Sequence, residues 1–85
     1  MYLHLGQDVV VRKKDLLGVF DLDNASHSHI TRSFLKAAEN EGRVIDISGE
    51  LPRSFVVVAE KNVNIYLSQI NTATLLKRFE SGGLE

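Results

Sequence analysis

Residues 42–67, with the sequence GRVIDISGELPRSFVVVAEKNVNIYL, decide the fold of this chain. We interpret them as three strands, the middle of which has consecutive apolar side chains at 55–58. A strand with one face in water alternates apolar and polar residues, so this strand offers both faces for burial. Each face therefore needs a cover, either a helix or another subunit. We expect the helix at 30–41 on one face and a neighbouring subunit on the other.

The composition restricts the class of protein. The 85 residues are enough for one domain, and 44% apolar and 25% charged residues are ordinary for a globular protein. The chain has no cysteine, which excludes a disulfide framework, a thiolate zinc site and a cysteine nucleophile. The formal net charge of −1 is not the basic surplus of a typical monomeric nucleic-acid binder, although a local cluster of cations can still attract phosphate.

The N-terminal sequence does not resemble a targeting segment. It lacks a basic start, and Gln7 and Asp8 interrupt its apolar run. No window approaches the ~18 apolar residues of a membrane span. We therefore expect a soluble, cytoplasmic protein with no membrane partner. We assign residues 1–80 to a single domain and 81–85 to a flexible tail, in which Leu84 and Glu85 are a candidate cloning remnant.

Hydrophobic periodicity and turn signals predict an α+β chain of order βββαβββα, with six short strands in a mostly antiparallel sheet arrangement. The predicted strands cover residues 2–5, 9–12, 16–22, 44–47, 53–60 and 63–68. The first helix is predicted at about 28–41, with Gly42 in the left-handed position after it. The second begins at Asn71, whose side chain accepts a bond from the amide of Ala73 or Thr74.

The apolar residues of each predicted helix fall on one stripe, which we expect to face the sheet. In the first helix this stripe contains Ile30, Phe34, Leu35, Ala37 and Ala38. In the second it contains Leu75, Leu76 and Phe79, with Lys77 and Arg78 pointing outward near the negative end of the helix.

One cluster has the residue types of a metal site. Asp21, Asp23, His27 and His29 form D-x-D-x-x-x-H-x-H, and carboxylates and imidazoles are common metal ligands. The spacing matches no known closed site, so helix capping and exposed histidines are the favoured interpretation. We predict no metal and no other cofactor.

Catalytic motifs give no support for an enzyme. The sequence contains no G-x-S-x-G, no P-loop and no G-x-G-x-x-G.

Two tyrosines are candidates for contacts with nucleic-acid bases. Tyr2 and Tyr66 fall on polar strand faces, where aromatic side chains can stack on bases, but half-exposed tyrosines are also common on ordinary sheets.

The basic residues are more informative. Arg12, Lys13 and Lys14 share one turn, while Arg32 and Lys36 are four apart on the first helix and so lie on one face. Arg43 and Arg53 flank the fourth strand. If these cations converge, they form a basic rim; from the residues alone, solvated surface charge is the favoured alternative.

Most of the chain resembles a known bacterial family. The resemblance is carried by MYLHLGQDVVVRKKDLLGVFDLDN, TRSFLKAAENEGRVIDIS, RSFVVVAEKNVNIYLS and INTATLLKRF. These stretches resemble the RemA/RemB-like regulators of extracellular matrix (biofilm) genes, and the RemB type most closely. The resemblance implies a LytTR-like fold, a ring-like oligomer and activation of matrix operons by DNA binding. Many weak sites in one assembly would bind DNA despite the small net charge of each chain.

The chain departs from the family pattern at one loop. RemA proteins carry an arginine pair directly after the glycine between the fourth and fifth strands, whereas Gly49 is followed here by Glu50 and Leu51. Arg53 matches the arginine just before the valine-rich strand. An acidic residue repels phosphate, so the resemblance shifts the expected DNA contacts to a wider set of cations: Arg53, Arg32, Lys36, Lys13, Lys14 and Arg12.

The resulting prediction is a non-enzymatic, homo-oligomeric regulator of matrix gene expression that contacts DNA phosphates. The alternative is a protein-interaction module that assembles with a RemA-like paralogue and binds DNA weakly or not at all, which Glu50 favours. A third interpretation, a small hydrolase or metal protein, depends on the Asp21 cluster alone.

Overall fold

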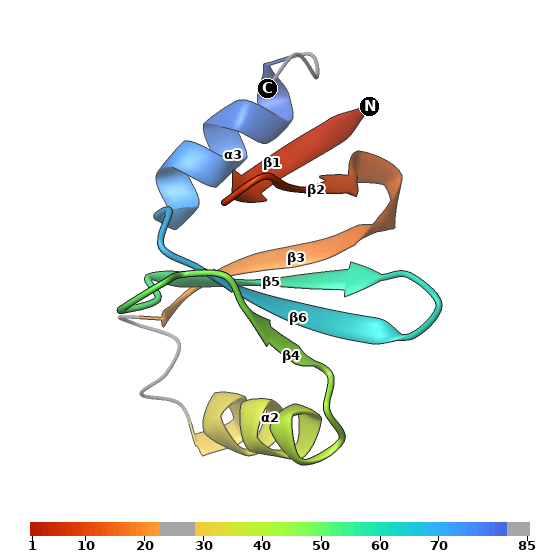
Figure 1. The fold of residues 1–85 in the computed structure, drawn as a ribbon, viewed down its shortest axis with the longest axis vertical. Helices are drawn as coiled ribbons and strands as arrows, with labels where there is room; N and C mark the ends of the chain where they lie inside the picture. The colour runs from red at the N-terminus through yellow and green to blue at the C-terminus, as the bar shows by residue number, and fades with distance from the viewer. Residues whose placement is uncertain (23–28, 82–85) are drawn as a thin grey trace.

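The computed structural model describes residues 1–22 and 29–81, and it confirms an α+β fold of order βββαβββα (Figure 1). A short 3-10 helix, η1, adds one turn after the second strand. In chain order the elements are β1 (Tyr2–Gly6), β2 (Val9–Arg12), η1 (Lys13–Asp15), β3 (Leu16–Asp21), α2 (His29–Asn40), β4 (Val44–Asp46), β5 (Ser54–Ala59), β6 (Val63–Ser68) and α3 (Thr72–Glu80).

The strands divide into two sheets. β1 and β2 form an antiparallel hairpin. The other four strands form a sheet of order β3-β5-β6-β4, in which β4 runs parallel to β6 and the remaining pairs are antiparallel. The expected mostly antiparallel arrangement is therefore confirmed, and β5, with its apolar run, lies inside the larger sheet.

The four-stranded sheet lies between two layers (Figure 1). One layer contains α2, and the other contains the β1–β2 hairpin with α3. Phe55 and Val57 belong to the core on the α2 side, together with Ala38 and Ile65. Val56 and Val58 belong to the core on the opposite side, together with Leu3, Leu5, Val11, Ile47 and Leu75.

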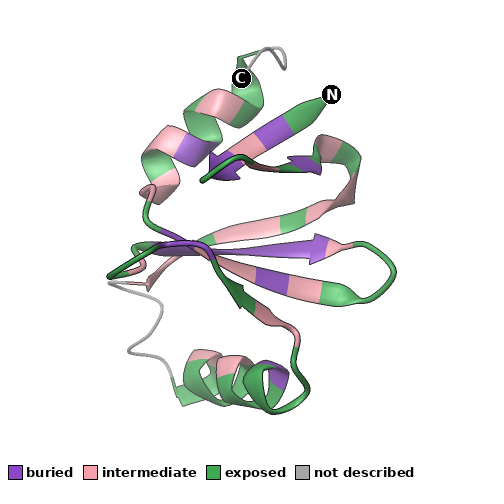
Figure 2. Cartoon of the chain, in the orientation of Figure 1, coloured by how far each residue is buried: buried purple, intermediate pink, exposed green. Residues whose placement is uncertain are grey.

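This arrangement explains why β5 has consecutive apolar side chains at 55–58. Residues 54–58 are all buried, as Figure 2 shows along β5. The expectation that a neighbouring subunit covers the second face was wrong, because the chain covers that face with its own N-terminal hairpin and C-terminal helix. The hairpin was missed as a cover because it lies far in the sequence from the β5 surface against which it packs.

Local signals placed the ends of the helices correctly. Gly42 adopts φ +73°, the left-handed conformation that ends α2 at low steric cost. The Asn71 side chain accepts a hydrogen bond of 2.9 Å from the Thr74 amide, as predicted for the start of α3. In the β1–β2 turn, Gln7 and Asp8 both have positive φ, which suits the twist of a tight hairpin.

The predicted apolar stripes are buried only in part. In α2, Ala38 is fully buried, whereas Ile30 and Phe34 are exposed. In α3, Leu75 is buried, whereas Leu76 and Phe79 are exposed. The expectation that each whole stripe faces the sheet was therefore wrong. A short helix that crosses a twisted sheet contacts it along part of its length, which helical periodicity alone does not reveal.

Two buried serines join the layers. Ser68 donates to the Leu5 carbonyl at 2.8 Å and accepts from the Ile70 amide at 3.0 Å, while Ser54 donates to the Ile70 carbonyl at 2.7 Å. The two serines are direct cross-strand partners on β5 and β6. They connect the sheet to β1 and to the entry of α3.

Within the described part of the chain, no helix combines the length and apolarity needed to cross a lipid bilayer.

Candidate nucleic-acid interface

The predicted DNA-contacting cations fall into two groups. Arg32 and Lys36 on α2 line a hollow of about 470 Å³ that also includes Pro52, the residue before Arg53. Arg12, Lys13 and Lys14 lie on β2 and η1, near the N-terminus. Figure 1 places α2 and the N-terminal region at opposite ends of the longest axis. The structure therefore does not gather all six cations into one surface.

We name the first group the α2 basic surface and define it as Arg32, Lys36 and Arg53. Arg32 and Lys36 are one helical turn apart and both exposed, because Leu35 packs against the α2-side core and turns its neighbours outward. Glu39 lines the same hollow, so the surface is of mixed charge with a basic excess.

Arg53 projects from a firmly held backbone. Its amide donates to the Ser68 carbonyl at 2.8 Å, and its carbonyl accepts from the Leu22 amide at 3.1 Å. The next residue, Ser54, is fully buried. The Arg53 side chain is exposed, so a hydrogen-bonded segment presents a cation at the end of the sheet. Such a geometry suits phosphate contacts, which position a nucleic acid without reading its bases.

The second group is engaged mainly within the chain. Arg12 forms an ion pair of 2.9 Å with Asp15. Lys13 donates to the carbonyls of Phe79 at 2.7 Å and Arg78 at 3.4 Å, and its ammonium lies 5.3 Å from the Phe79 ring centroid. Lys14 is exposed on the same turn. Lys13 therefore stabilises the end of α3, a contact across 66 residues that no local pattern could predict.

Arg78 is a further cation whose placement differs from the prediction. It was expected to point outward from α3, but it donates to the His4 carbonyl on β1 at 3.1 Å. The expectation failed because α3 packs against the hairpin, which brings the His4 carbonyl within reach of the guanidinium.

The loop at 47–53 is held at its start by hydrogen bonds between Ser48 and Asp46, the last residue of β4. Asp46 accepts hydrogen bonds from the Ser48 hydroxyl at 2.6 Å and the Ser48 amide at 2.9 Å. These bonds, the hydroxyl first, lower the pKa of Asp46 below its ordinary value. Gly49 follows with φ +83°, and the loop then presents Glu50 and Leu51 to solvent, Leu51 with an exposed fraction of 82%.

The two tyrosines have different environments. The Tyr66 hydroxyl donates to Glu60 Oε1 at 3.1 Å, and Asn64 donates to the same oxygen at 2.9 Å. Burial, with the hydrogen bond and charge of Glu60, raises the pKa of Tyr66. Tyr66 is thus held in a polar network on the β5–β6 hairpin, whereas Tyr2 is exposed near Arg12 and Lys14.

The possible metal cluster cannot be assembled from the described residues. Asp23 and His27 lie outside residues 1–22 and 29–81, and the structure places only Asp21 at the end of β3 and His29 at the start of α2. Among the residues that the structure describes, no group of three carboxylate, histidine or cysteine side chains could hold a metal ion.

The similarity to known proteins extends over nearly all the strands and helices of the chain. A family described as RemA-like, extracellular matrix regulatory protein A-like, matches residues 2–79, which run from the start of β1 into the last turn of α3. Extracellular matrix regulatory protein B of Bacillus subtilis (strain 168) is 40% identical over 78 residues, covering 92% of this chain and 89% of the relative. Both descriptions are of regulatory proteins, and neither names an enzymatic activity.

Proposed function

Because the chain belongs to the RemA-like family of extracellular matrix regulatory proteins, we propose that it regulates matrix gene expression by binding DNA. The observation that supports DNA contact is the position of Arg32 and Lys36 around a hollow that reaches Pro52, beside the exposed Arg53. In this proposal these three cations bind backbone phosphates, and Lys14, Arg12 and Lys13 form a separate, weaker basic region.

We further propose that the protein acts as a homo-oligomer, ring-like in form, with a fold of the LytTR type. A chain of net charge −1 has little long-range attraction for DNA. Several copies held together would present several α2 basic surfaces at high effective concentration, so that modest contacts combine into useful affinity. Phosphate contacts of this kind release counterions, and binding weakens steeply as salt rises.

The test is a DNA titration of the Arg53→Ala variant at several salt concentrations, followed by fluorescence anisotropy. We expect weaker binding than wild type and a salt slope reduced by about one per contacting chain. Lys77→Ala is the matched control, since it removes an exposed cation from α3 and should leave affinity close to wild type. Failure of wild-type protein to bind matrix-promoter DNA at low salt would refute the proposal.

A second candidate function is favoured by the loop at 47–53. Glu50 and Leu51 are exposed where the RemA pattern has arginines, and an apolar side chain that is 82% exposed suits a protein partner better than phosphate. In this alternative the chain assembles with a RemA-like paralogue. Light scattering of the two purified proteins, alone and mixed, tests it: a mixed complex lost in Leu51→Asp would support it, and separate masses would exclude it.

A further inference from the structure

The hollow of the α2 basic surface has an apolar floor. Its volume is about 470 Å³, and it lies where α2 meets β4 at the edge of the sheet. Five of the eight described residues that line it are apolar, and they come from five separate segments of the chain: Leu22, Leu35, Val44, Pro52 and Leu67. Phosphate contacts need cations and make no use of such a floor. The lining therefore indicates a ligand with an apolar body.

The floor is continuous with the packed interior. Four of its side chains are half-buried and pack against the core on the α2 side, namely Leu22, Leu35, Val44 and Leu67. Leu67 is held between two strands, because it pairs with Phe55 on β5 and with Asp46 on β4. The Leu22 amide donates to the Arg53 carbonyl at 3.1 Å and so joins two walls of the hollow. A floor fixed in this way is preformed, as is usual for small-molecule sites.

Charged side chains lie at the rim of the hollow. Arg32 and Lys36 form the α2 side, and Glu39 lies three residues beyond Lys36 on the same helix face. Two cations and one carboxylate leave a single positive charge in excess, which complements a ligand with one negative charge. The Glu39 carboxylate disfavours a second negative charge, because like charges in proximity repel. The rim thus selects a monoanion.

We propose that this hollow binds a small amphiphilic carboxylate, with its hydrocarbon chain on the apolar floor and its head group at Arg32 and Lys36. A volume of about 470 Å³ lies within the usual range for small-molecule sites. The bound carboxylate occupies two of the cations that the proposed function assigns to DNA phosphates, so ligand and DNA compete. The competition rests on the proposed function, whereas binding of the carboxylate does not.

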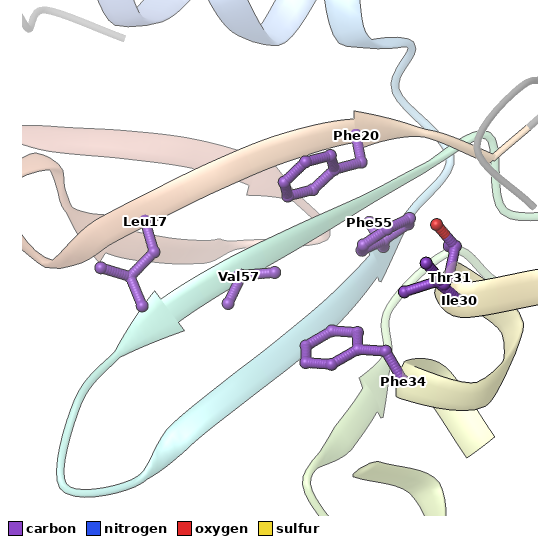
Figure 3. A pocket seen from close by; sticks show the side chains of 7 residues that line it. All are labelled: Leu17, Phe20, Ile30, Thr31, Phe34, Phe55 and Val57. Carbon is purple, nitrogen blue, oxygen red and sulfur yellow. The ribbon is translucent and has the colours of Figure 1, made fainter. Parts of the chain in front are cut away.

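A second hollow provides an internal comparison. It lies between β3 and α2, has a volume of about 340 Å³ and is lined by Leu17, Phe20, Ile30, Thr31, Phe34, Phe55 and Val57 (Figure 3). None of these described residues is ionisable. A carboxylate placed there would lose water without gaining a cation, which is costly. The second hollow can accept an apolar chain but offers no partner for the head group.

The test is a titration of the ¹⁵N-labelled protein with decanoate, below its micelle concentration, followed by NMR. We expect amide shifts at Leu22, Val44 and Leu67 rather than at Leu17 and Phe20. In the series hexanoate, octanoate and decanoate, the affinity should rise by up to about fourfold for each CH₂ that becomes buried. Shifts centred on Leu17 and Phe20, or an affinity that does not depend on chain length, would overturn the inference.

Two variants test the head group and the floor separately. Lys36→Gln removes a rim charge and should weaken decanoate binding about two- to fivefold, the size of an exposed charge pair. Val44→Thr keeps the shape and strand preference of the side chain but places a hydroxyl in the floor, and it should also weaken binding. Lys77→Gln, at an exposed cation of α3, is the control and should bind as wild type does. Wild-type affinity in Lys36→Gln, an exposed position where folding is not at risk, would overturn the inference.

Fluorescence anisotropy of labelled promoter DNA tests the competition. Decanoate should release DNA from the wild-type protein at concentrations at which acetate, of equal charge and ionic strength, does not. DNA that stays bound while NMR shows the hollow to be filled would refute the competition. A wild-type protein that binds no DNA would refute the proposed function, and the titration without DNA would still decide whether the carboxylate binds.

Discussion

Ser68 is fully buried, yet its hydroxyl bonds two backbone groups from distant parts of the chain. It donates to the Leu5 carbonyl on β1 and accepts from the Ile70 amide before α3. Replacing it with alanine would leave both groups without this partner in a dry layer, where an unsatisfied polar group costs more than a single bond is worth. The Ser68 hydroxyl oxygen therefore helps to attach both the β1–β2 hairpin and the start of α3 to the sheet.

The first prediction at this scale is that Ser68→Ala lowers the free energy of unfolding by about 1–3 kcal/mol. Urea denaturation followed by circular dichroism measures it. Ser33→Ala, at an exposed position of α2, is the control and should change stability by no more than about 0.5 kcal/mol. Equal stabilities for the two variants would show that the Ser68 bonds are dispensable.

Asp46 gives a prediction of pH dependence. Its pKa is lowered in the folded chain by hydrogen bonds from Ser48. A lowered pKa stabilises the fold at pH values above the unfolded pKa, near 3.9, and this contribution is lost as the pH falls toward the folded value. The stability difference between wild type and Asp46→Asn should therefore shrink between pH 7 and pH 3 in urea titrations. A difference that stays constant with pH would contradict this role of the carboxylate.

At the scale of elements, the main surprise is how the last helix is attached. α3 has nine residues, too few to be stable alone in water. It is held by Leu75 in the core, by Arg78 on the His4 carbonyl and by Lys13 at its C-terminal carbonyls. A cation at this end also complements the helix dipole. The η1 turn thus acts as a C-terminal cap supplied from the opposite end of the sequence.

Lys13→Met should consequently lower the free energy of unfolding by about 1 kcal/mol, since it removes the charge and the bonds to α3 while keeping the aliphatic stem. Lys14→Met, on the same turn but exposed, should change it by less than about 0.5 kcal/mol. Chemical denaturation of both variants checks the difference. If the two behave alike, the Lys13 contact contributes nothing to stability in solution.

At the scale of the whole molecule, three surfaces point in different directions. Arg32 and Lys36 lie on the side of α2 opposite the exposed Ile30 and Phe34, and the Arg12–Lys14 turn lies toward the other end of the long axis. Cations therefore lie at two separate places on a chain whose formal net charge is only −1.

Much of the fold was predictable because its signals are local. The alternation in β6, the Asn71 cap and the Gly42 stop each depend on a few neighbouring residues, and the structure confirms them. The apolar run at 55–58 also required a strand buried on both faces. Within the candidate site, helical spacing alone predicted that Arg32 and Lys36 lie on the same face of α2.

The remaining features depend on contacts between residues far apart in the sequence. The identity of the cover on the second face of β5, the attachment of Lys13 to α3 and the approach of Arg32 and Lys36 to Pro52 were set by how the layers dock. The same docking exposed Ile30 and Phe34, which the helical pattern had placed toward the sheet. The sequence alone determined the elements and the apolar character of β5, because propensity and periodicity act within a few residues. Tertiary structure alone decided which apolar and basic side chains became surfaces, because burial depends on the whole packed chain.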